Sequence, residues 1–530
     1  MKTYIKIPFL ILAIQLLAGC RVQQHEYFIT AFGARDDGRT VSTSSIQQAI
    51  DACHQAGGGR VVVPAGEFVT GTMILKSNVE LYLQQGARLI GSLDTADYRV
   101  EGQRRGMLFA YRAKNITLSG EGEIYARGSS FFMADKTHLG QDFDRMVTRQ
   151  GADYLPVDPV PPDGPITYDY RPGMMVVILQ CEQVAIKDLT FRDSPEWTFR
   201  IADCDDVTVT GISIHNNLLI PNSDGIHCTT SRNVRISGCD IRAGDDAIIV
   251  TGFGTRVGVS GDIPGKIDYT TREFGNKTGY AENVTVTNCL LQSRSSGIRV
   301  GYGVNPIRHC VFSNLVIYGS NRGLGVFSRD DGSIQDILFS DIVIKTRLHS
   351  GHWWGNGEPI HVSAIRQDPD IPAGLVKNIR FRNIIAESES GIFIYGTGES
   401  PVENVQLEDV AIHVGKGIYT DSYGGNFDLR PVYTTDLGVF EHDIPALYSQ
   451  FTEGLTIQDL TVTWDKKLPE WMTHAIYCSD FSNLTIDGFY GSPARPGLPA
   501  IELANGEGAT LENLRASDPG LTLVNRINVK

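Results

Sequence analysis

Three aspartates stand close enough in the sequence to do acid and base chemistry together. Asp224 lies in the run Asn-Ser-Asp-Gly-Ile of residues 222–226, and Asp245 and Asp246 lie in the run Gly-Asp-Asp-Ala of residues 244–247. Crowded carboxylates repel one another, which raises the pKa of at least one of them and keeps that one protonated near neutral pH. A protonated acid beside a carboxylate base is the pair required for water to break a glycosidic bond.

The same aspartates also have a structural interpretation. Aspartate is common in turns, and two adjacent aspartates are often only solvated. Successive strand residues point to opposite faces, so Asp245 and Asp246 can share one face only if the chain bends or bulges there. Two polar neighbours extend the candidate site: Asn222 could bind a substrate hydroxyl or a neighbouring carboxylate, and His227 is a candidate substrate contact or an ordinary structural histidine.

A repeat of short strands must position these residues. Its unit is a polar residue, an alternation of apolar residues and a turn, and successive units are separated by 23 (206 − 183), 27 (233 − 206) or 50 (283 − 233) residues. A period in the twenties, doubled where a loop is inserted, indicates a solenoid, and the alternation makes its units strands. We predict an all-β fold, a single-stranded right-handed parallel β-helix that forms one domain over residues 20–530. The units begin at Asn115, Gln183, Asp206, Asn233, Asn283, Gln335, Asn378, Asn404, Gly454 and Asn483.

One amphipathic helix precedes the coils, within an N-terminal cap of about residues 27–70. Ser44 with Gln47 suits a capping box at its start, and the glycines 57–59 end it. A solenoid needs its open end covered, so we expect this helix to be the cap. Its apolar face consists of Ile46, Ala49, Ile50 and Cys53.

Four long stretches do not follow the repeat, and loops of such length are usually functional or disordered. Their aromatic residues could stack on sugar rings beside a groove, or could merely cover the sides of the solenoid. Trp353 and Trp354 are the candidates for substrate contact. The stretches are residues 129–172, 252–281, 346–374 and 415–452.

Composition agrees with a solenoid and excludes several classes of function. A chain of 530 residues is too long for one compact core, and 56 glycines indicate many turns. With 47 Lys and Arg against 61 Asp and Glu, the formal net charge is −14, which argues against nucleic-acid binding. No zinc-ligand spacing, phosphate loop or dinucleotide fingerprint stands out, so we expect no metal, no cofactor and a monomer.

The N-terminus has the features of an export signal. Lys2 and Lys6 accompany an apolar run that ends in Leu-Ala-Gly-Cys at residues 17–20, like a bacterial lipobox. We therefore predict a signal peptide over residues 1–19 and a lipid on Cys20. The protein would be anchored in the bacterial cell envelope, at the outer membrane, facing the periplasm or the surface. No other apolar run approaches the ~18 residues needed to span a bilayer, so this anchor is the only expected membrane contact.

Eight cysteines remain after Cys20. An oxidising compartment permits disulfides. Five of them, however, sit beside apolar strand-like runs at similar points of the repeat, which favours a ladder of buried free cysteines. These five are Cys181, Cys204, Cys239, Cys289 and Cys310.

Several further motifs accompany the aspartates. They are the runs at residues 32–38, 57–66, 120–122, 171–172 and 194–197. Together with the two aspartate motifs they resemble glycoside hydrolase family 28, the polygalacturonase-like, pectin-degrading β-helix enzymes, over roughly residues 28–345. The resemblance implies an inverting mechanism on a polysaccharide or oligosaccharide. It makes Asp245 the general acid, while Asp224 and Asp246 activate the water.

Two downstream motifs of that family are missing. Ser295-Ser296-Gly297 stands where the family has Gly-His-Gly, and residues 323–327 stand where it has Arg-Ile-Lys. In the family the histidine assists the carboxylates, and the arginine and lysine hold the galacturonate carboxylate. Arg299, which alternates with apolar neighbours and should point outward, could supply the missing cation, and so could Arg329. Both could equally be ordinary surface arginines.

The departures predict family-like cleavage of a different sugar. We expect an exported glycosidase for a pectic or related plant or algal glycan that is not a standard polygalacturonase, with loops that favour an exo-acting pocket. The acidic chain with a weakened basic site favours a neutral or mixed-sugar cleavage point. Two alternatives stay open: a uronate lyase that uses Ca²⁺ and Arg299 as base, and a non-catalytic glycan-binding surface protein.

Overall fold

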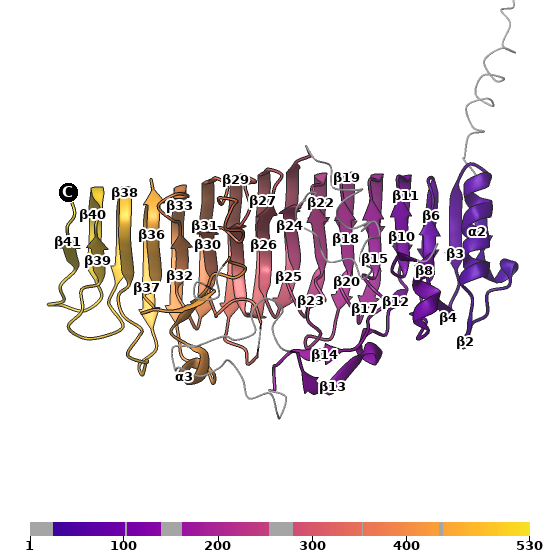
Figure 1. Ribbon diagram of the computed structural model, residues 1–530, viewed down its shortest axis with the longest axis horizontal. Helices are drawn as coiled ribbons and strands as arrows, with labels where there is room; N and C mark the ends of the chain where they lie inside the picture. The colour runs from indigo at the N-terminus through magenta and orange to yellow at the C-terminus, as the bar shows by residue number, and fades with distance from the viewer. Residues whose placement is uncertain (1–24, 101–102, 139–161, 254–278, 352, 434–437) are drawn as a thin grey trace, which may run out of the picture.

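The computed structural model describes residues 25–100, 103–138, 162–253, 279–351, 353–433 and 438–530. The predicted signal peptide and Cys20 lie outside these residues. Nearly every described strand pairs in parallel with a strand one coil before it and one coil after it, so the predicted parallel β-helix is confirmed. Figure 1 shows the coils stacked along one axis, from α2 (Thr43–Gln55) at one end to β41 (Val524–Ile527) at the other.

Each central coil contributes three short strands, and each strand pairs in register with its counterpart on the next coil. Neighbouring strands lie about 4.8 Å apart, so residues of equal register on successive coils form a column along the axis. The three coils around the aspartates are β16 (Glu182–Lys187), β17 (Thr190–Arg192) and β18 (Phe199–Ala202); β19 (Asp205–Thr210), β20 (Ser213–His215) and β21 (Ile226–Thr229); and β22 (Arg232–Ser237), β23 (Asp240–Ala243) and β24 (Ile248–Gly252).

Later coils merge the first two strands into one long strand, since β25 (Ala281–Ser293) pairs with both β22 and β23. The long strands that follow are β27 (Ile307–Ser320), β29 (Ile334–Thr346), β31 (Val376–Ser388), β33 (Val402–Val414), β37 (Thr456–Trp464), β38 (Ile476–Gly491) and β40 (Glu507–Ala516). The third row continues as β26 (Ser296–Gly303), β28 (Arg322–Ser328), β30 (Ile360–Ala364), β32 (Ile392–Tyr395), β36 (Leu447–Glu453) and β39 (Ile501–Ala504).

At the N-terminal end, α2 covers the open end of the coils (Figure 1). The predicted apolar face of α2 is buried, but the predicted capping box is wrong. Gln47 instead exchanges hydrogen bonds with the backbone of Ile74, because the helix packs directly on the first coils. The strands are β1 (Glu26–Phe28), β2 (Asp37–Val41), β3 (Gly59–Val63), β4 (Gly66–Thr70), β5 (Met73–Leu75), β6 (Val79–Leu83), β7 (Ala87–Gly91), β8 (Arg99–Val100), β9 (Gln103–Arg104), β10 (Leu108–Tyr111), β11 (Lys114–Gly120), β12 (Glu123–Tyr125) and β15 (Val176–Leu179).

The polar residue that opens each repeat unit has a backbone role. Asn233 and Asn283 both adopt positive φ, at 56° and 58°, a conformation that asparagine tolerates better than most residues. The Asn283 amide also donates to the side-chain oxygen of Asn233 on the coil before, at 3.0 Å. The alternating residues that follow, such as Val234 and Ile236, are buried in the core. The repeat therefore encodes the turn, the stacking and the interior together.

The eight cysteines of the described residues are all buried and free. Their packing supports the predicted ladder: Cys181 and Cys204 lie on neighbouring coils, and the Cys181 N–H donates to the Cys204 sulfur at 3.4 Å.

The long loops project from one side of the solenoid, where β13 (Phe132–Thr137), β14 (Ile166–Tyr168) and α3 (Thr420–Tyr423) lie in Figure 1. The last loop also holds the hairpin of β34 (Asn426–Asp428) and β35 (Val439–Glu441). The predicted loop at 252–281 lies mostly outside the described residues. No helix of the described chain is long and apolar enough to cross a membrane.

Candidate active site

The three aspartates come together where the third row of strands begins. Asp224 stands two residues before Ile226 of β21, and Asp246 stands two residues before Ile248 of β24. The two isoleucines pair in register, so Asp224 and Asp246 occupy equal places on adjacent coils. Asp245 lies in a bend between β23 and β24, where its carboxylate accepts a hydrogen bond of 2.9 Å from the Asp246 N–H. This bend meets the condition for both carboxylates to share one site.

Two glycines allow the coils to approach closely at this point. A Cβ on Gly225 would lie 2.2 Å from the carbonyl oxygen of Ala247, and one on Gly244 would lie 2.2 Å from that of Ile220. Both contacts are far shorter than van der Waals distance. The glycines that flank the aspartates in the two motifs are therefore required by packing.

Burial and mutual repulsion set the protonation of the aspartates. Burial, and then the charge of Asp246, raises the pKa of Asp245 to about 7. Burial, and then the charges of Asp245 and Asp246, raises the pKa of Asp224 well above its ordinary value. Asp245 can therefore hold, near neutral pH, the proton that a general acid donates.

Asp246 has both a backbone hydrogen-bond donor and a positively charged partner. The Ser296 N–H donates to its Oδ1 at 2.7 Å, and the Arg299 Nε lies 3.1 Å from its Oδ2. Burial opposes the charge of Arg299, but Asp246 and the other acidic groups near it together outweigh burial, and the pKa of Arg299 is raised. A carboxylate with such partners is suited to the role of base.

Asn222 and His227 lie against the aspartates. The Asn222 amide donates to Asp245 Oδ2 at 3.3 Å. Of the two roles predicted for Asn222, this is the contact with a neighbouring carboxylate. The His227 ring is fully buried, with its Nδ1 3.6 Å from Asp224 Oδ2, and it stacks on Trp197 at 3.8 Å between ring centres. No part of the His227 ring reaches the surface of the described structure, so the structural alternative predicted for His227 fits its position.

The two candidate replacement cations lie in different settings. Arg299 points outward as predicted, pairs in register with Gly325 of the next coil, and leaves 16% of its side chain exposed beside Asp246. Arg329 is fully buried, and its guanidinium donates to three backbone carbonyls. In this position Arg329 presents no surface for the substrate contact that the sequence predicts.

The adjacent residues Trp353 and Trp354 also lie in different settings. Trp353 is 2% exposed, and its indole N–H donates to the backbone oxygen of Asp163 at 2.6 Å, which fits the alternative predicted for the loop aromatics, that they cover the sides of the solenoid. Trp354 stays partly exposed, with the Arg430 guanidinium 4.8 Å from its ring centre. The Asn321 amide donates to the Trp354 carbonyl at 2.9 Å and fixes the backbone there.

Register relates Trp354 to the aspartates. Arg322 pairs with Ser296, whose N–H binds Asp246 on the coil before. Asn321 directly precedes Arg322, so the residue that fixes Trp354 stands two coils beyond the aspartates, about 10 Å along the axis. Trp354 therefore lies on the same side of the solenoid as the acidic site.

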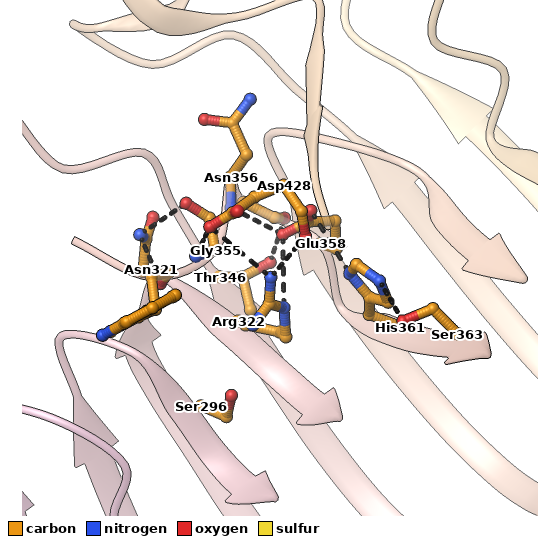
Figure 2. A network of polar contacts seen from close by, with 12 residues as sticks. Ser296, Asn321, Arg322, Thr346, Gly355, Asn356, Glu358, His361, Ser363 and Asp428 are labelled. Carbon is orange, nitrogen blue, oxygen red and sulfur yellow. Dashed lines mark hydrogen bonds and ion pairs between the residues drawn. The ribbon is translucent and has the colours of Figure 1, made fainter. Parts of the chain in front are cut away.

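A second group of buried charges in the same column was not predicted (Figure 2). Glu358 stands two residues before the first isoleucine of β30, as Asp224 does before β21, and its Oε1 lies 3.6 Å from His361 Nδ1. The shared spacing, carboxylate-x-x-His, is the signal that could have found it. Both Glu358 and His361 are fully buried.

Arginines compensate this second group. The Arg322 Nε lies 3.7 Å from Glu358, and an Arg322 N–H donates to the Asp428 backbone oxygen at 3.1 Å. The Arg430 Nε donates to the Asp428 carboxylate at 2.8 Å, and the Gly355 N–H donates to its other oxygen at 2.6 Å. The contacts of Arg322 and Gly355 with Asp428, drawn as dashed lines in Figure 2, join two separate loop segments.

Asp163 joins the first and third long loops. Arg347 donates to its carboxylate at 2.9 Å, His349 lies 3.4 Å from the same oxygen, and Trp353 binds its backbone. The hydrogen bond from His349 and, against the effect of burial, that from Arg347 lower the pKa of Asp163 below its ordinary range. The two loops thus meet beside the acidic site.

Comparison with known proteins shows what this chain is similar to. The family model described as Glycosyl hydrolases family 28 matches residues 169–423, which include all three aspartates. A probable polygalacturonase of Vitis vinifera is 22% identical over 416 residues, which are 74% of this chain and 75% of its own. An exo-poly-alpha-D-galacturonosidase of Dickeya chrysanthemi is 29% identical over 248 residues, which are 42% of this chain and 41% of its own.

The fold is that of a solved enzyme. The exopolygalacturonase of Thermotoga maritima superimposes with a TM-score of 0.58 at 19% identity, over 83% of this chain and 92% of that one. The family match, the relatives and the clustered aspartates agree with one another, and from them we conclude that this chain is a glycosidase whose residues 169–423 match glycoside hydrolase family 28.

Proposed function

We propose that this glycosidase hydrolyses a pectic polysaccharide or oligosaccharide with inversion, with Asp245 as the acid and with Asp224 and Asp246 activating the water. The observation that carries the proposal is the contrast between neighbours: Asp245 has a pKa of about 7, whereas Asp246 is paired with Arg299. An acid and a base are thus available at one pH. The names of the relatives support a pectic substrate.

The third-row strand on the coil after Arg299 is β28, and its residues support a cleavage point other than that of a standard polygalacturonase. Gly325 has no side chain, and the Phe327 ring lies so close that a Cβ on Gly325 would be 2.6 Å from it. Phe327 is 3% exposed and packs between the guanidinium groups of Arg322 and Arg329, at 4.7 and 5.3 Å. Neither position offers a cation to a uronate, which favours a neutral or mixed-sugar site served by Arg299 alone.

The coil before Asp224 supports the same conclusion. Trp197 occupies the place of Asp224 one coil earlier, since Phe199 pairs with Ile226. It forms an apolar cluster with Phe109 and others, and these side chains keep 7% and 8% of their surface exposed. Apolar and aromatic surface suits the C–H faces of sugars better than their carboxylates.

The loop contacts support action on chain ends. Asp163 ties the first long loop to the third, and Asn321 fixes the third loop two coils beyond the aspartates. A groove walled by joined loops accepts a chain end more readily than the middle of a polymer. We therefore propose an exo-acting pocket, with Trp354 as a sugar contact on its wall.

Product analysis tests the proposal. Purified protein is incubated with polygalacturonate, rhamnogalacturonan and neutral pectic side chains, and products are followed by chromatography and by proton NMR of the first anomer formed. We expect one short product from the earliest times, inverted at the anomeric carbon, and faster release from a mixed or neutral glycan. A spread of oligomers would contradict exo action, retention would contradict the mechanism, and an unsaturated product lost with a chelator would favour a lyase.

For location we propose a lipid anchor on Cys20 in the bacterial cell envelope, a proposal supported by the lipobox-like sequence. Cells grown with radiolabelled palmitate should label the wild-type protein and leave a Cys20→Ser variant unlabelled. Equal labelling of both would contradict the anchor.

A further inference from the structure

The position of the proton on His227 can be traced through its hydrogen bonds. The Thr251 hydroxyl donates to the Thr229 hydroxyl at 3.2 Å. A hydroxyl has one proton, so Thr251 has only lone pairs to offer to His227 Nε2, which lies 3.2 Å away. Nε2 must then carry the imidazole proton and donate it to Thr251. The other ring nitrogen, Nδ1, is left with a lone pair.

That lone pair faces Asp224. Within the described residues, neither His227 Nδ1 nor Asp224 Oδ1 has a hydrogen-bond partner, and Nδ1 lies 3.6 Å from Asp224 Oδ2. Two facing lone pairs repel one another in a buried site, and the contact becomes attractive only when a proton lies between them.

The surroundings place that proton on the carboxyl group. Burial, and then Asp245 and Asp246, raises the pKa of Asp224 well above its ordinary value. Burial, and then Arg299 and Arg200, lowers the pKa of His227 well below its ordinary value. The neutral acid and the neutral imidazole are thus favoured together.

We propose that His227 is a positioning residue that holds Asp224 in its protonated form, so that Asp246 alone is the base in the hydrolysis proposed above. The Asp224 O–H donates to Nδ1, and Asp224 Oδ1 accepts a hydrogen bond from the attacking water and orients it. The water gives its other proton to Asp246 as its oxygen bonds to the anomeric carbon. Asp245 gives its proton to the leaving oxygen. Asp224 thereby contributes to activation of the water without being the base.

The charged groups that face the pair come from three parts of the chain. Arg299 lowers the pKa of Asp224, but burial and the two other aspartates together outweigh it. The cations disfavour an imidazolium and the anions disfavour another carboxylate. From β18 comes Arg200, from the bend before β24 come Asp245 and Asp246, and from β26 comes Arg299. The uncharged neighbours are Trp197, Thr251 and Phe253.

The first test needs no substrate. In the full chain labelled with ¹⁵N at histidine, His227 is expected to be neutral from pH 5 to 8, with the proton on Nε2. A His227→Asn variant assigns its signals among the 12 histidines. A proton on Nδ1, or an imidazolium that titrates near its ordinary pKa, would overturn the proposal.

The second test follows Asp224 by ¹³C NMR of labelled carboxyl groups, assigned with Asp224→Asn. In His227→Phe, which removes the acceptor, Asp224 should ionise at lower pH, by about one pH unit. His227→Asn, whose amide oxygen can take the place of Nδ1, should restore the wild-type titration. The matched control is His361→Phe in the second carboxylate–histidine unit, which should leave Asp224 unchanged. Identical titration of Asp224 in wild type and His227→Phe would overturn the proposal.

Kinetics supply a signature that a merely structural role would not produce. An ionised Asp224 in His227→Phe should raise the pKa of Asp245, so the alkaline limb of kcat/KM should move to higher pH. A fall in kcat with the limb unmoved would contradict the proposal. If no glycan is hydrolysed at all, the proposed function fails, while the two NMR titrations still decide the state of Asp224 and His227.

Discussion

Two carboxylate–histidine units occupy the same place in the coil and differ in charge state. Asp224 with His227 and Glu358 with His361 are four coils apart in one column, and each has a carboxylate oxygen 3.6 Å from Nδ1. Burial, and then the nearby aspartates, raises the pKa of Asp224. Burial also opposes the charge of Glu358, but Arg322, His361 and the Asn356 N–H together outweigh it, and the pKa of Glu358 is lowered.

The comparison separates the effect of burial on the carboxyl pKa from the effect of neighbouring charges. Both carboxylates are almost fully enclosed, at 3% and 0% exposure, so burial alone cannot give shifts of opposite sign. The neighbouring charges decide: acids beside Asp224, and Arg322 beside Glu358. Asp224 therefore lies in surroundings that disfavour its charge, which is useful for catalysis. Glu358 has compensating partners and helps to hold the loops.

The largest expected effect comes from Asp245→Asn. It removes the donated proton, so kcat should fall by about 10³-fold or more, with the fold unchanged by circular dichroism. Glu358→Gln is the matched change in the second unit, and folded Glu358→Gln protein should keep kcat within about tenfold of wild type. Activity of Asp245→Asn above about a tenth of wild type would contradict the assignment of the acid.

Removing the cation of the second unit should mainly affect stability. Arg322→Met leaves Glu358 and Asp428 buried without that partner, which should lower the free energy of unfolding by about 3–5 kcal/mol in denaturant titrations. Arg299→Met should cost clearly less, because the aspartates beside it can take up a proton. Equal losses in the two variants would show that the two units do not differ as described.

Arg299→Met should instead change the pH dependence of activity. Arg299 lowers the pKa of Asp224 and Asp245, so its removal should raise both. The alkaline limb of kcat/KM should move to higher pH, and the maximum should fall about 10–100-fold as Asp246 loses its partner. A limb that moves to lower pH would contradict the description of the site.

The smallest expected effect is a change in how the stability of the protein depends on pH. The pKa of Asp245 rises from 3.8 to about 7 on folding, so the stability that its proton gives is complete below about pH 4 and is lost as pH rises through about 7. Asp245→Asn cannot ionise, so its melting temperature should gain about 2 °C on wild type between pH 5 and pH 8. Glu358→Gln should show no such gain, because the pKa of Glu358 is lowered.

The sequence predicts best what is decided locally. Asn233 and its equivalents act within their own turn and on the next coil, so the repeat predicts strands, turns and stacking together. The aspartates are predicted by their motifs, and the bend at Asp245 follows from the need to share a face. These parts of the fold and site depend on neighbours in the chain or one coil away.

Residues whose surroundings come from distant segments are not predicted. Trp353 and Trp354 are adjacent, but only the contact with Asp163, 190 residues away, buries the first. Arg329 is buried by a carbonyl that lies 100 residues further along the chain. Glu358 becomes part of a network through Arg322 and Asp428, which no local pattern connects with it.

The contact between Gly325 and Phe327 also constrains the order in which substitutions can accumulate in this protein. An arginine gained at position 325 would meet the Phe327 ring, which His361 holds edge-on at 4.9 Å while two arginines flank its faces. Phe327 would have to be replaced first, and that step alone would leave a gap in a packed region without improving any contact with substrate. A change to the uronate-binding pattern thus passes through an unfavourable intermediate, so the specificity proposed above would tend to persist in descendants of this sequence.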